Sequence, residues 1–182
     1  MSLIGHSFGG AVAMKAGLAL QERVHRLVLF EPNVFYMLAM HGNHEAYAEI
    51  KAVRDHFKLR GEKGDWYGVA ANFIDHWNGE GAWAGINESR RSALLRAMMH
   101  AYHEWDSVFD ETTPVDAWMP LAERTVLIVG ANARTSIRGI ADILRNNLVG
   151  LGYFKIPHGG HMAPLTRPDL VNPVLIDALD RP

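Results

Sequence analysis

A glycine-rich segment near the start of the chain, Gly5-His6-Ser7-Phe8-Gly9-Gly10, carries the clearest chemical signal. It fits the pattern Gly-x-Ser-x-Gly, in which a serine on a sharp turn between a strand and a helix presents its hydroxyl for attack on an acyl group. Small neighbours are needed at such a turn, and we expect Gly5 and Gly9 to let the strand and the helix approach closely. The backbone N–H of Phe8, at the start of the helix, could then stabilise an oxyanion.

The same six residues permit a plainer interpretation, a glycine-rich turn that contains a serine by chance. Other functions of glycine-rich loops fit less well. The segment lacks the second glycine of the dinucleotide-binding pattern, and it lacks the Gly-Lys-Ser/Thr step of a phosphate-binding loop. The serine interpretation therefore depends on a suitable base elsewhere in the chain.

Two histidines near the end of the chain, His158 and His161, are candidates for that base. An unaided serine hydroxyl is a poor nucleophile at neutral pH, so an imidazole must accept its proton and later return one to the leaving group. The two histidines stand in the glycine-rich run His158-Gly159-Gly160-His161, where either could also be a solvated or backbone-bonded loop residue. The spacing alone leaves both open.

The elements that must position these residues alternate between short apolar runs and helical patterns. Strands are predicted at Leu3 and Ile4 and at three later runs, Arg26–Phe30, Thr125–Val129 and Tyr153–Ile156. Apolar runs of this length are typical of strands buried on both faces of a parallel sheet. Helices are predicted at Gly10–Leu20, Arg138–Leu148 and Pro168–Leu179, so the fold class is α/β with a parallel sheet and flanking helices.

The character of the chain changes between Asn33 and Pro120, where strand-like runs give way to aromatic-rich amphipathic segments. Helices are predicted there at Glu45–Leu59, Trp66–Trp77 and Ser89–Val108, with a glycine-spaced loop at Asn78–Gly85. We therefore predict a core formed by residues 1–32 and 121–182, into which residues 33–120 are inserted as a helical cap or lid.

The sequence resembles the α/β-hydrolase family in three segments that occur in the family's order: residues 5–10, residues 126–130 and Pro157-His158-Gly159-Gly160-His161-Met162-Ala163-Pro164. The resemblance favours His161 over His158 as the general base. It begins at the strand that leads into the serine turn, so the chain resembles the C-terminal part of the family fold. In the family, the preceding part supplies the first half of the sheet and a second oxyanion N–H. We expect this chain alone to be poorly folded or inactive, because its first strand would expose an apolar edge.

The acid that would complete a triad is less obvious. In much of the family it lies in the loop after the penultimate strand, but Gly130-Ala131-Asn132-Ala133-Arg134-Thr135 contains no carboxylate. Some branches place the acid after the strand that follows the serine helix, and here that strand ends in Phe30-Glu31-Pro32. The resemblance thus favours Glu31 as the acid. The alternative is that Glu31 only caps or salt-bridges the entrance of the cap. Asp142, on a predicted helix, is the second choice.

The resemblance implies a serine hydrolase that cleaves an ester or related acyl bond of a small apolar substrate through an acyl-enzyme. Ser7, His161 and Glu31 would be catalytic, Phe8 would supply an oxyanion donor, and His6 and Phe8 would contact the substrate. No cofactor is implied. Carbon–carbon hydrolysis, lyase or perhydrolase chemistry would use the same serine, and a non-catalytic truncated protein is the alternative from another class.

Composition excludes several other function classes. A net charge of -2 with interspersed charges gives no footprint for nucleic acid or an anionic membrane, and without cysteine no disulfide or thiolate cluster can form. The first residues carry no signal-peptide pattern, and no apolar run is long enough to span a bilayer, so we expect a cytoplasmic protein by default. Homo-oligomers are possible. His41 and His44, like His100 and His103, have a metal-compatible spacing but no clear third ligand, and we interpret them as solvated.

Overall fold

The structure, a computed structural model, describes residues 1–180 and contains one four-stranded parallel sheet. Its strands are β1 (Ser2–His6), β2 (Arg26–Phe30), β3 (Thr125–Gly130) and β4 (Gly152–Ile156), paired in that order. Every residue of β2 and β3 is buried, as expected for strands covered on both faces. All four predicted strands are therefore confirmed, with ends that differ by at most two residues.

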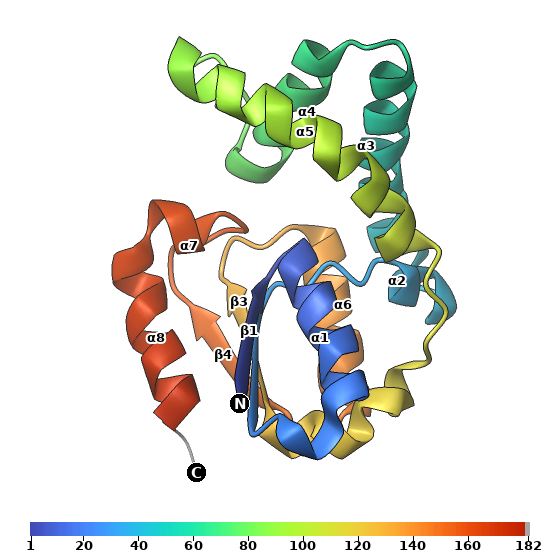
Figure 1. The fold of residues 1–182 in the computed structure, drawn as a ribbon, viewed down its shortest axis with the longest axis vertical. Coiled ribbons are helices and arrows are strands. Elements are labelled where there is room, and N and C mark those ends of the chain that lie inside the picture. Colours follow the sequence, from blue (N-terminus) through green and yellow to red (C-terminus); the bar gives the residue numbers. More distant parts are fainter. Residues whose placement is uncertain (181–182) are drawn as a thin grey trace.

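Helices cover both faces of the sheet (Figure 1). On one face lie α1 (Phe8–Leu20), the short 3-10 helix η1 (Gln21–Arg23) and α6 (Thr135–Asn147); on the other lie α7 (Ala163–Thr166) and α8 (Pro168–Asp180). In β2, Leu27 and Leu29 belong to the core under α1 and α6, whereas Val28 and Phe30 belong to the core under α8. This two-period alternation places an apolar layer on each face.

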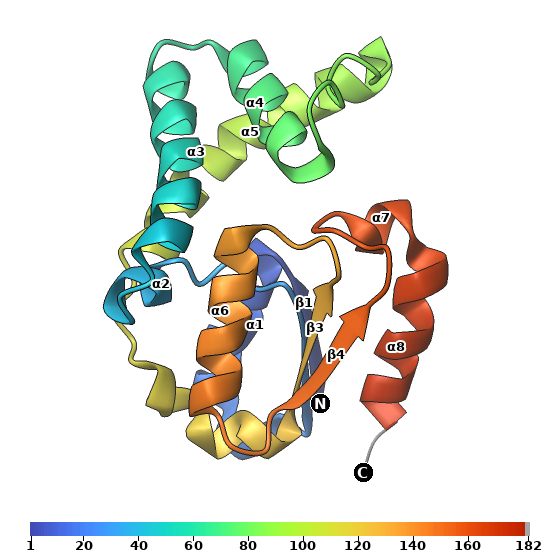
Figure 2. The ribbon, with the colours of Figure 1, turned by 180° about the vertical axis from the view of Figure 1, so that it is seen from behind.

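The first part of the segment between β2 and β3, up to the end of α5, is helical and lies beyond the carboxyl ends of the strands (Figures 1 and 2). It contains α2 (Tyr36–Met40), α3 (His44–Glu62), α4 (Trp66–Asn78) and α5 (Glu88–Phe109). Three of these helices begin at a side chain that accepts a backbone N–H of the first turn, namely Asn43 for α3, Asp65 for α4 and Asn87 for α5. The three long helices match the prediction, while the short α2 was not predicted.

Aromatic side chains hold this helical segment together and tie it to the loop after β2. Trp105 contacts the rings of Phe35, Phe57, Phe73 and Phe109 with centroid distances between 5.6 and 6.4 Å. Such offset and edge-to-face pairs add to the free energy gained from burying the rings. Because Phe35 lies at the end of the short loop after β2, the cluster fixes the position of α5 relative to the end of the sheet.

The chain returns to the sheet through the 3-10 segment η2 (Val115–Arg124), whose first half had been predicted to belong to the cap. Trp118 in this segment is 2% exposed, and its Nε1 donates to the carbonyl of Met14 in α1 at 3.0 Å. Residues from about 115 onward thus pack on the sheet layer. The predicted boundaries of core and cap stay a prediction, and the last two residues of the predicted core segment 121–182 lie outside the described residues.

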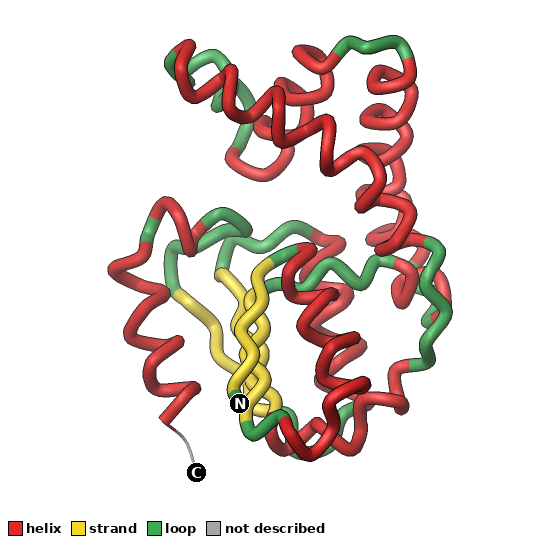
Figure 3. Tube along the Cα trace, in the orientation of Figure 1, coloured by secondary structure: helices red, strands yellow, loops and turns green. Residues whose placement is uncertain are grey.

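Among the described residues, β1 pairs only with β2, which makes it one edge of the sheet. Ile4 on this strand is 53% exposed, and Val12 on α1 is 52% exposed. Loops, rather than strands or helices, occupy the carboxyl edge of the sheet, where the strands end (Figure 3). No helix within residues 1–180 combines the length and apolarity needed to cross a membrane.

Candidate active site

Ser7 stands alone between the last residue of β1 and the first residue of α1, in a strained conformation. Its φ is 56° and its ψ is -125°, a region that side-chain-bearing residues rarely adopt outside functional turns. The turn is held by the Ser7 N–H, which donates to the carbonyl of Phe30 at 3.1 Å, and by the Ser7 carbonyl, which accepts from the N–H of Gly10 at 2.9 Å. This geometry matches the predicted turn between a strand and a helix.

The glycines around Ser7 differ in whether the structure has room for a side chain at their positions. A Cβ on Gly5 would lie well inside van der Waals distance of the Gly9 carbonyl, and a Cβ on Gly10 would lie 2.9 Å from Pro32. Gly9, by contrast, has open space around the position of a Cβ, so the expectation that Gly9 permits close packing was wrong. The close approach is made by Gly5 to the turn and by Gly10 to the loop after β2, because Gly9 faces outward from the turn.

Glu31 follows β2 at the same edge of the sheet and is completely buried. Its backbone is also in the left-handed region, with a φ of 45°, and its N–H donates to the carbonyl of Ile128 at 3.1 Å. One carboxylate oxygen, Oε1, accepts the N–H of Gly130 at 2.8 Å, and Oε2 lies 2.8 Å from Nδ1 of His161. Both oxygens of this buried carboxylate are therefore hydrogen-bonded.

His161 joins Glu31 to Ser7. Its Nε2 lies 2.9 Å from Oγ of Ser7, and its ring is 3% exposed. With the Glu31 carboxylate accepting from Nδ1–H, Nε2 is left as the acceptor for the serine hydroxyl. The loop that carries His161 packs tightly on the end of β3, because Gly130 has no side chain at the point where the Gly159 carbonyl passes.

The other candidates from the sequence lie elsewhere. His158 is exposed, and the structure gives it no contact with Ser7. Asp142, the second choice for the acid, lies on α6 with a side chain that is 67% exposed and 3.7 Å from Arg145. Of the competing residues, the structure thus brings together Ser7, His161 and Glu31.

Asn33 is a polar neighbour of the serine that the sequence did not reveal. Its Nδ2 donates to Oγ of Ser7 at 2.8 Å, and its backbone N–H donates to the Ser7 carbonyl at 3.1 Å. The Ser7 hydroxyl can accept from Asn33 while it donates to His161, so its orientation is determined from two sides. The only signal in the sequence was the position of Asn33, two residues after Glu31.

Two further side chains pack against the imidazole of His161. Trp77 of α4 stacks on it with a centroid distance of 3.9 Å and an interplanar angle of 28°. His6 approaches at 4.9 Å, and its Nε2 donates to the carbonyl of His161 at 2.8 Å. Burial, followed by the neighbouring His161, lowers the pKa of His6 to about 4. Nε2 of His6 thus already has a partner in the structure, and the predicted contact of His6 with substrate stays a prediction.

Phe8 is the first residue of α1, so its N–H precedes the first hydrogen bond within that helix. Its side chain, with Ser7 and Asn33, lines a small cavity of about 60 Å³ that reaches up to α5. A larger cavity of about 670 Å³ is lined by Trp77 and by Gly160 and Met162, the residues that precede and follow His161 in the sequence. The small cavity is the one that contacts the serine.

No group of three or more histidine, aspartate or glutamate side chains within residues 1–180 is arranged to hold a metal ion. His100 and His103 are exposed on α5, and His41 and His44 are exposed at the start of the helical segment.

Comparison with known proteins agrees with this architecture. The family model described as "Alpha/beta hydrolase family" matches residues 2–174. No curated protein matches the chain.

Solved structures with the same fold include MGS-M2, an alpha/beta hydrolase enzyme from a Medee basin deep-sea metagenome library, with a TM-score of 0.75 and 13% identity. A bromoperoxidase from Bacillus anthracis has a TM-score of 0.70 with 17% identity, and an esterase from Exiguobacterium antarcticum has 0.69 with 17% identity. These three matches cover 100%, 99% and 99% of this chain, but only 65%, 67% and 66% of theirs. The chain spans about two thirds of the length of these structures.

At such identities the structural likeness establishes the fold, while the family model, which matches nearly the entire chain, establishes the relationship. The chain belongs to the alpha/beta hydrolase family.

Proposed function

We propose that this protein is a serine hydrolase that cleaves an ester or related acyl bond of a small, largely apolar substrate. The observation that carries the proposal is the continuous hydrogen-bonded path from Glu31 through His161 to Ser7, with distances of 2.8 and 2.9 Å. A buried carboxylate, an oriented imidazole and a serine on a strained turn are the parts that nucleophilic acyl transfer requires.

In the proposed first step, Oγ of Ser7 forms a bond to the carbonyl carbon of the substrate while its proton passes to Nε2 of His161. Glu31 holds the imidazole in the correct tautomer and stabilises the imidazolium. The negative charge that develops on the carbonyl oxygen is stabilised by the N–H of Phe8 and by the N-terminus of α1. A second oxyanion donor, by resemblance to the family, would come from a loop that precedes the serine strand in the family fold.

In the proposed second half, the bond between the acyl carbon and the leaving group breaks, and His161 returns its proton to the leaving group. Water then attacks the acyl carbon while it gives a proton to the same imidazole; the bond between the acyl carbon and Oγ breaks, and His161 returns the proton to Oγ, which releases the carboxylic acid. Asn33 would keep Oγ aligned before the attack, through its 2.8 Å hydrogen bond.

The substrate class follows from the walls of the serine cavity. Its lining includes the aromatic side chains of Phe8, Phe35, Phe73 and Trp105, which favours an apolar group next to the scissile bond. We also assign residues 33–120 the role of a cap, because Phe73 and Trp105 of this segment close the cavity above Ser7. The esterase from Exiguobacterium antarcticum has the same fold, which is compatible with ester hydrolysis here.

The test is covalent labelling with a fluorophosphonate, which reacts with activated serines. We expect one label per chain, located on Ser7 by peptide mapping, absent from Ser7→Ala and at least about 100-fold slower in His161→Ala. The longer protein, if the gene extends upstream, should be labelled in parallel. Absence of label from both forms, in protein that circular dichroism shows to be folded, would refute the proposal.

A further inference from the structure

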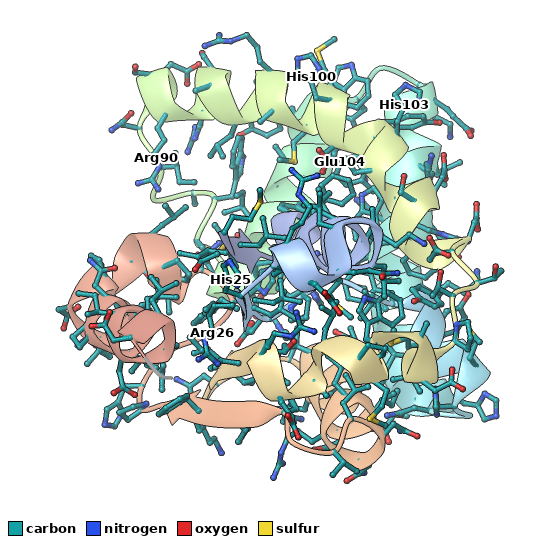
Figure 4. All side chains as sticks on the ribbon, turned by 60° about the horizontal axis from the view of Figure 1, so that its bottom comes forward. His25, Arg26, Arg90, His100, His103 and Glu104 are labelled. Carbon is teal, nitrogen blue, oxygen red and sulfur yellow. The ribbon has the colours of Figure 1, made fainter. Side chains whose placement is uncertain are left out.

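The small cavity beside Ser7 combines aromatic walls with one acidic side chain. Phe35, Phe73 and Trp105 form part of its walls. Glu104, which precedes Trp105 on α5, also lines it. Glu104 is the only charged residue that lines it. Figure 4 labels Glu104 on the side of α5 that faces α1, and His100, one helical turn earlier, lies on the same face of the helix but is exposed.

The carboxylate of Glu104 has no hydrogen-bond or ion-pair partner among the residues that the structure describes. Burial raises the pKa of this carboxyl, and the neighbouring His100 on the same helix opposes that shift. Half-buried carboxylates are normally paired, because an unpaired one loses solvation without gaining a compensating contact. A ligand that brings a positive charge into the cavity would supply that contact.

Aromatic rings next to a carboxylate are suited to one chemical class in particular. The faces of Trp and Phe rings attract cations, and a carboxylate nearby adds a charge-assisted hydrogen bond when the cation carries N–H groups. The cavity volume of about 60 Å³ corresponds to roughly two water molecules at about 30 Å³ each. A primary ammonium with one or two methylene groups fits this space, whereas an anion would be repelled.

We propose that Glu104 is a specificity-determining residue that selects substrates with an ammonium group close to the scissile acyl bond. The inference rests on the proposed function and refines it, since the remaining walls still favour an otherwise apolar substrate. A purely aliphatic ester would leave Glu104 without a partner when bound, so the proposal distinguishes this chain from a hydrolase for such esters.

The experiment measures how small ligands slow the labelling of Ser7 by a fluorophosphonate. n-Propylammonium, 1-propanol and propanoate have similar shapes and carry positive, zero and negative charge, and all are used at equal concentration and ionic strength. We expect n-propylammonium to protect Ser7 about fivefold more strongly than 1-propanol, and propanoate to protect least. Equal protection by all three in the wild-type chain would overturn the proposal without any variant.

Two variants then assign the effect to Glu104. Glu104→Gln keeps the size of the side chain and should weaken protection by n-propylammonium about fivefold, leaving protection by 1-propanol unchanged. Asp110→Asn, which removes an exposed carboxylate at the end of the same helix, should behave as wild type. Labelling without ligand reports whether each variant retains its site.

The outcomes separate the two proposals. If Ser7 is not labelled at all, the serine-hydrolase proposal fails and the ammonium proposal fails with it. If Ser7 is labelled but Glu104→Gln and wild type are protected equally by n-propylammonium, only the role of Glu104 is overturned. Where turnover is measurable, 4-nitrophenyl esters of β-alanine and butyric acid form a matched pair, and Glu104→Gln should reduce the preference for the β-alanine ester.

Discussion

The carboxylate of Glu31 lies 2.8 Å from Nδ1 of His161, and its other oxygen accepts the backbone N–H of Gly130 at 2.8 Å. The acid is thus fixed from two sides in a fully buried position between β2 and β3. Much of the family carries its acid in the loop that begins at Gly130, after β3. Here the acid instead follows the adjacent strand β2, and it contacts that loop through its hydrogen bond to the N–H of Gly130. Glu31 is the only buried carboxylate within residues 1–180.

Replacement of Glu31 by glutamine tests this arrangement. The amide oxygen can still accept from Gly130, but an NH₂ group facing Nδ1 favours the wrong imidazole tautomer, so we expect the rate of Ser7 labelling to fall by roughly 1,000-fold or more. The fold should be kept. Asp142→Asn removes the other acid considered from the sequence and should label at the wild-type rate. Near-normal labelling of Glu31→Gln would show that Glu31 is not the triad acid.

The three residues of the proposed triad could be identified from the sequence because each follows a strand. Ser7, Glu31 and His161 all stand just beyond a short apolar run, and the carboxyl ends of parallel strands meet at one edge of a sheet. The family resemblance then decided between His158 and His161, and it favoured Glu31 over Asp142 as the acid. The sheet and the long helices were predictable for the same reason, since their apolar periodicity is local.

The rest of the site could not be predicted, because it depends on packing between distant elements. Trp77 and Glu104 reach the site only through the way in which α4 and α5 lie over the strand ends, and aromatic residues at helical spacing give no hint of which one faces a ligand. Asn33 depends on the path of a loop. The incorrect assignment of Gly9 has a similar cause, since the pattern does not say which glycine of the turn faces a neighbouring backbone.

The contrast between Gly5 and Gly9 gives a prediction about stability. A methyl group at Gly5 would clash with the backbone of the turn, so Gly5→Ala should lower the free energy of unfolding by about 1–3 kcal/mol or distort the serine. Gly9→Ala meets open space on a helix and should be neutral or stabilising by up to about 1 kcal/mol. Urea unfolding of both variants checks this. Equal effects would contradict the local geometry described for the turn.

Two partly buried histidines near the site, His6 and His76, predict acid sensitivity. Burial first, and then the neighbouring His161 for His6 and Arg134 for His76, lowers the pKa of both histidines from 6.5 to about 4. The folded protein therefore binds these protons less readily than the unfolded chain, so the stability from their neutral forms is complete above pH 6.5 and is lost as pH falls towards 4. Unfolding in urea at pH 7 and pH 5 should show this loss.

His6→Gln should flatten that dependence, because one of the groups that take up a proton on unfolding is removed. Exposed His25 provides the matched control, and His25→Gln should keep the wild-type difference between the two pH values. A wild-type slope in His6→Gln would mean that the acid sensitivity arises from other groups.

The free edge of β1 predicts self-association of the 182-residue chain. Ile4 and Val12 expose apolar surface beside unpaired backbone groups, and such edges tend to pair with other chains. Ile4→Lys should shift the chain towards monomer in sedimentation velocity runs at increasing concentration. Ile176→Lys places the same charge on α8, where Ile176 is 59% exposed, and should leave association unchanged. Equal behaviour of the two variants would rule out the edge as the contact.

The stack of Trp77 on His161 predicts that α4 contributes to the reactivity of the serine. The indole is 6% exposed and covers one face of the imidazole at 3.9 Å, so it restricts rotation of the ring away from Ser7. Trp77→Leu should slow labelling of Ser7 about tenfold, and Trp77→Phe should restore most of the rate because it keeps an aromatic face.

Loss of the large side chain will also destabilise the fold by up to about 3 kcal/mol, and Trp83→Leu controls for that effect. Trp83 is similarly buried at 5% exposure, but its ring makes an edge-to-face contact with Tyr67 instead of a stack on His161. If Trp83→Leu slows labelling as much as Trp77→Leu at equal melting temperature, the stack has no specific role. A slower rate in Trp77→Leu alone assigns the ordering of the imidazole to the helical segment and makes the proposed cap part of the reaction site.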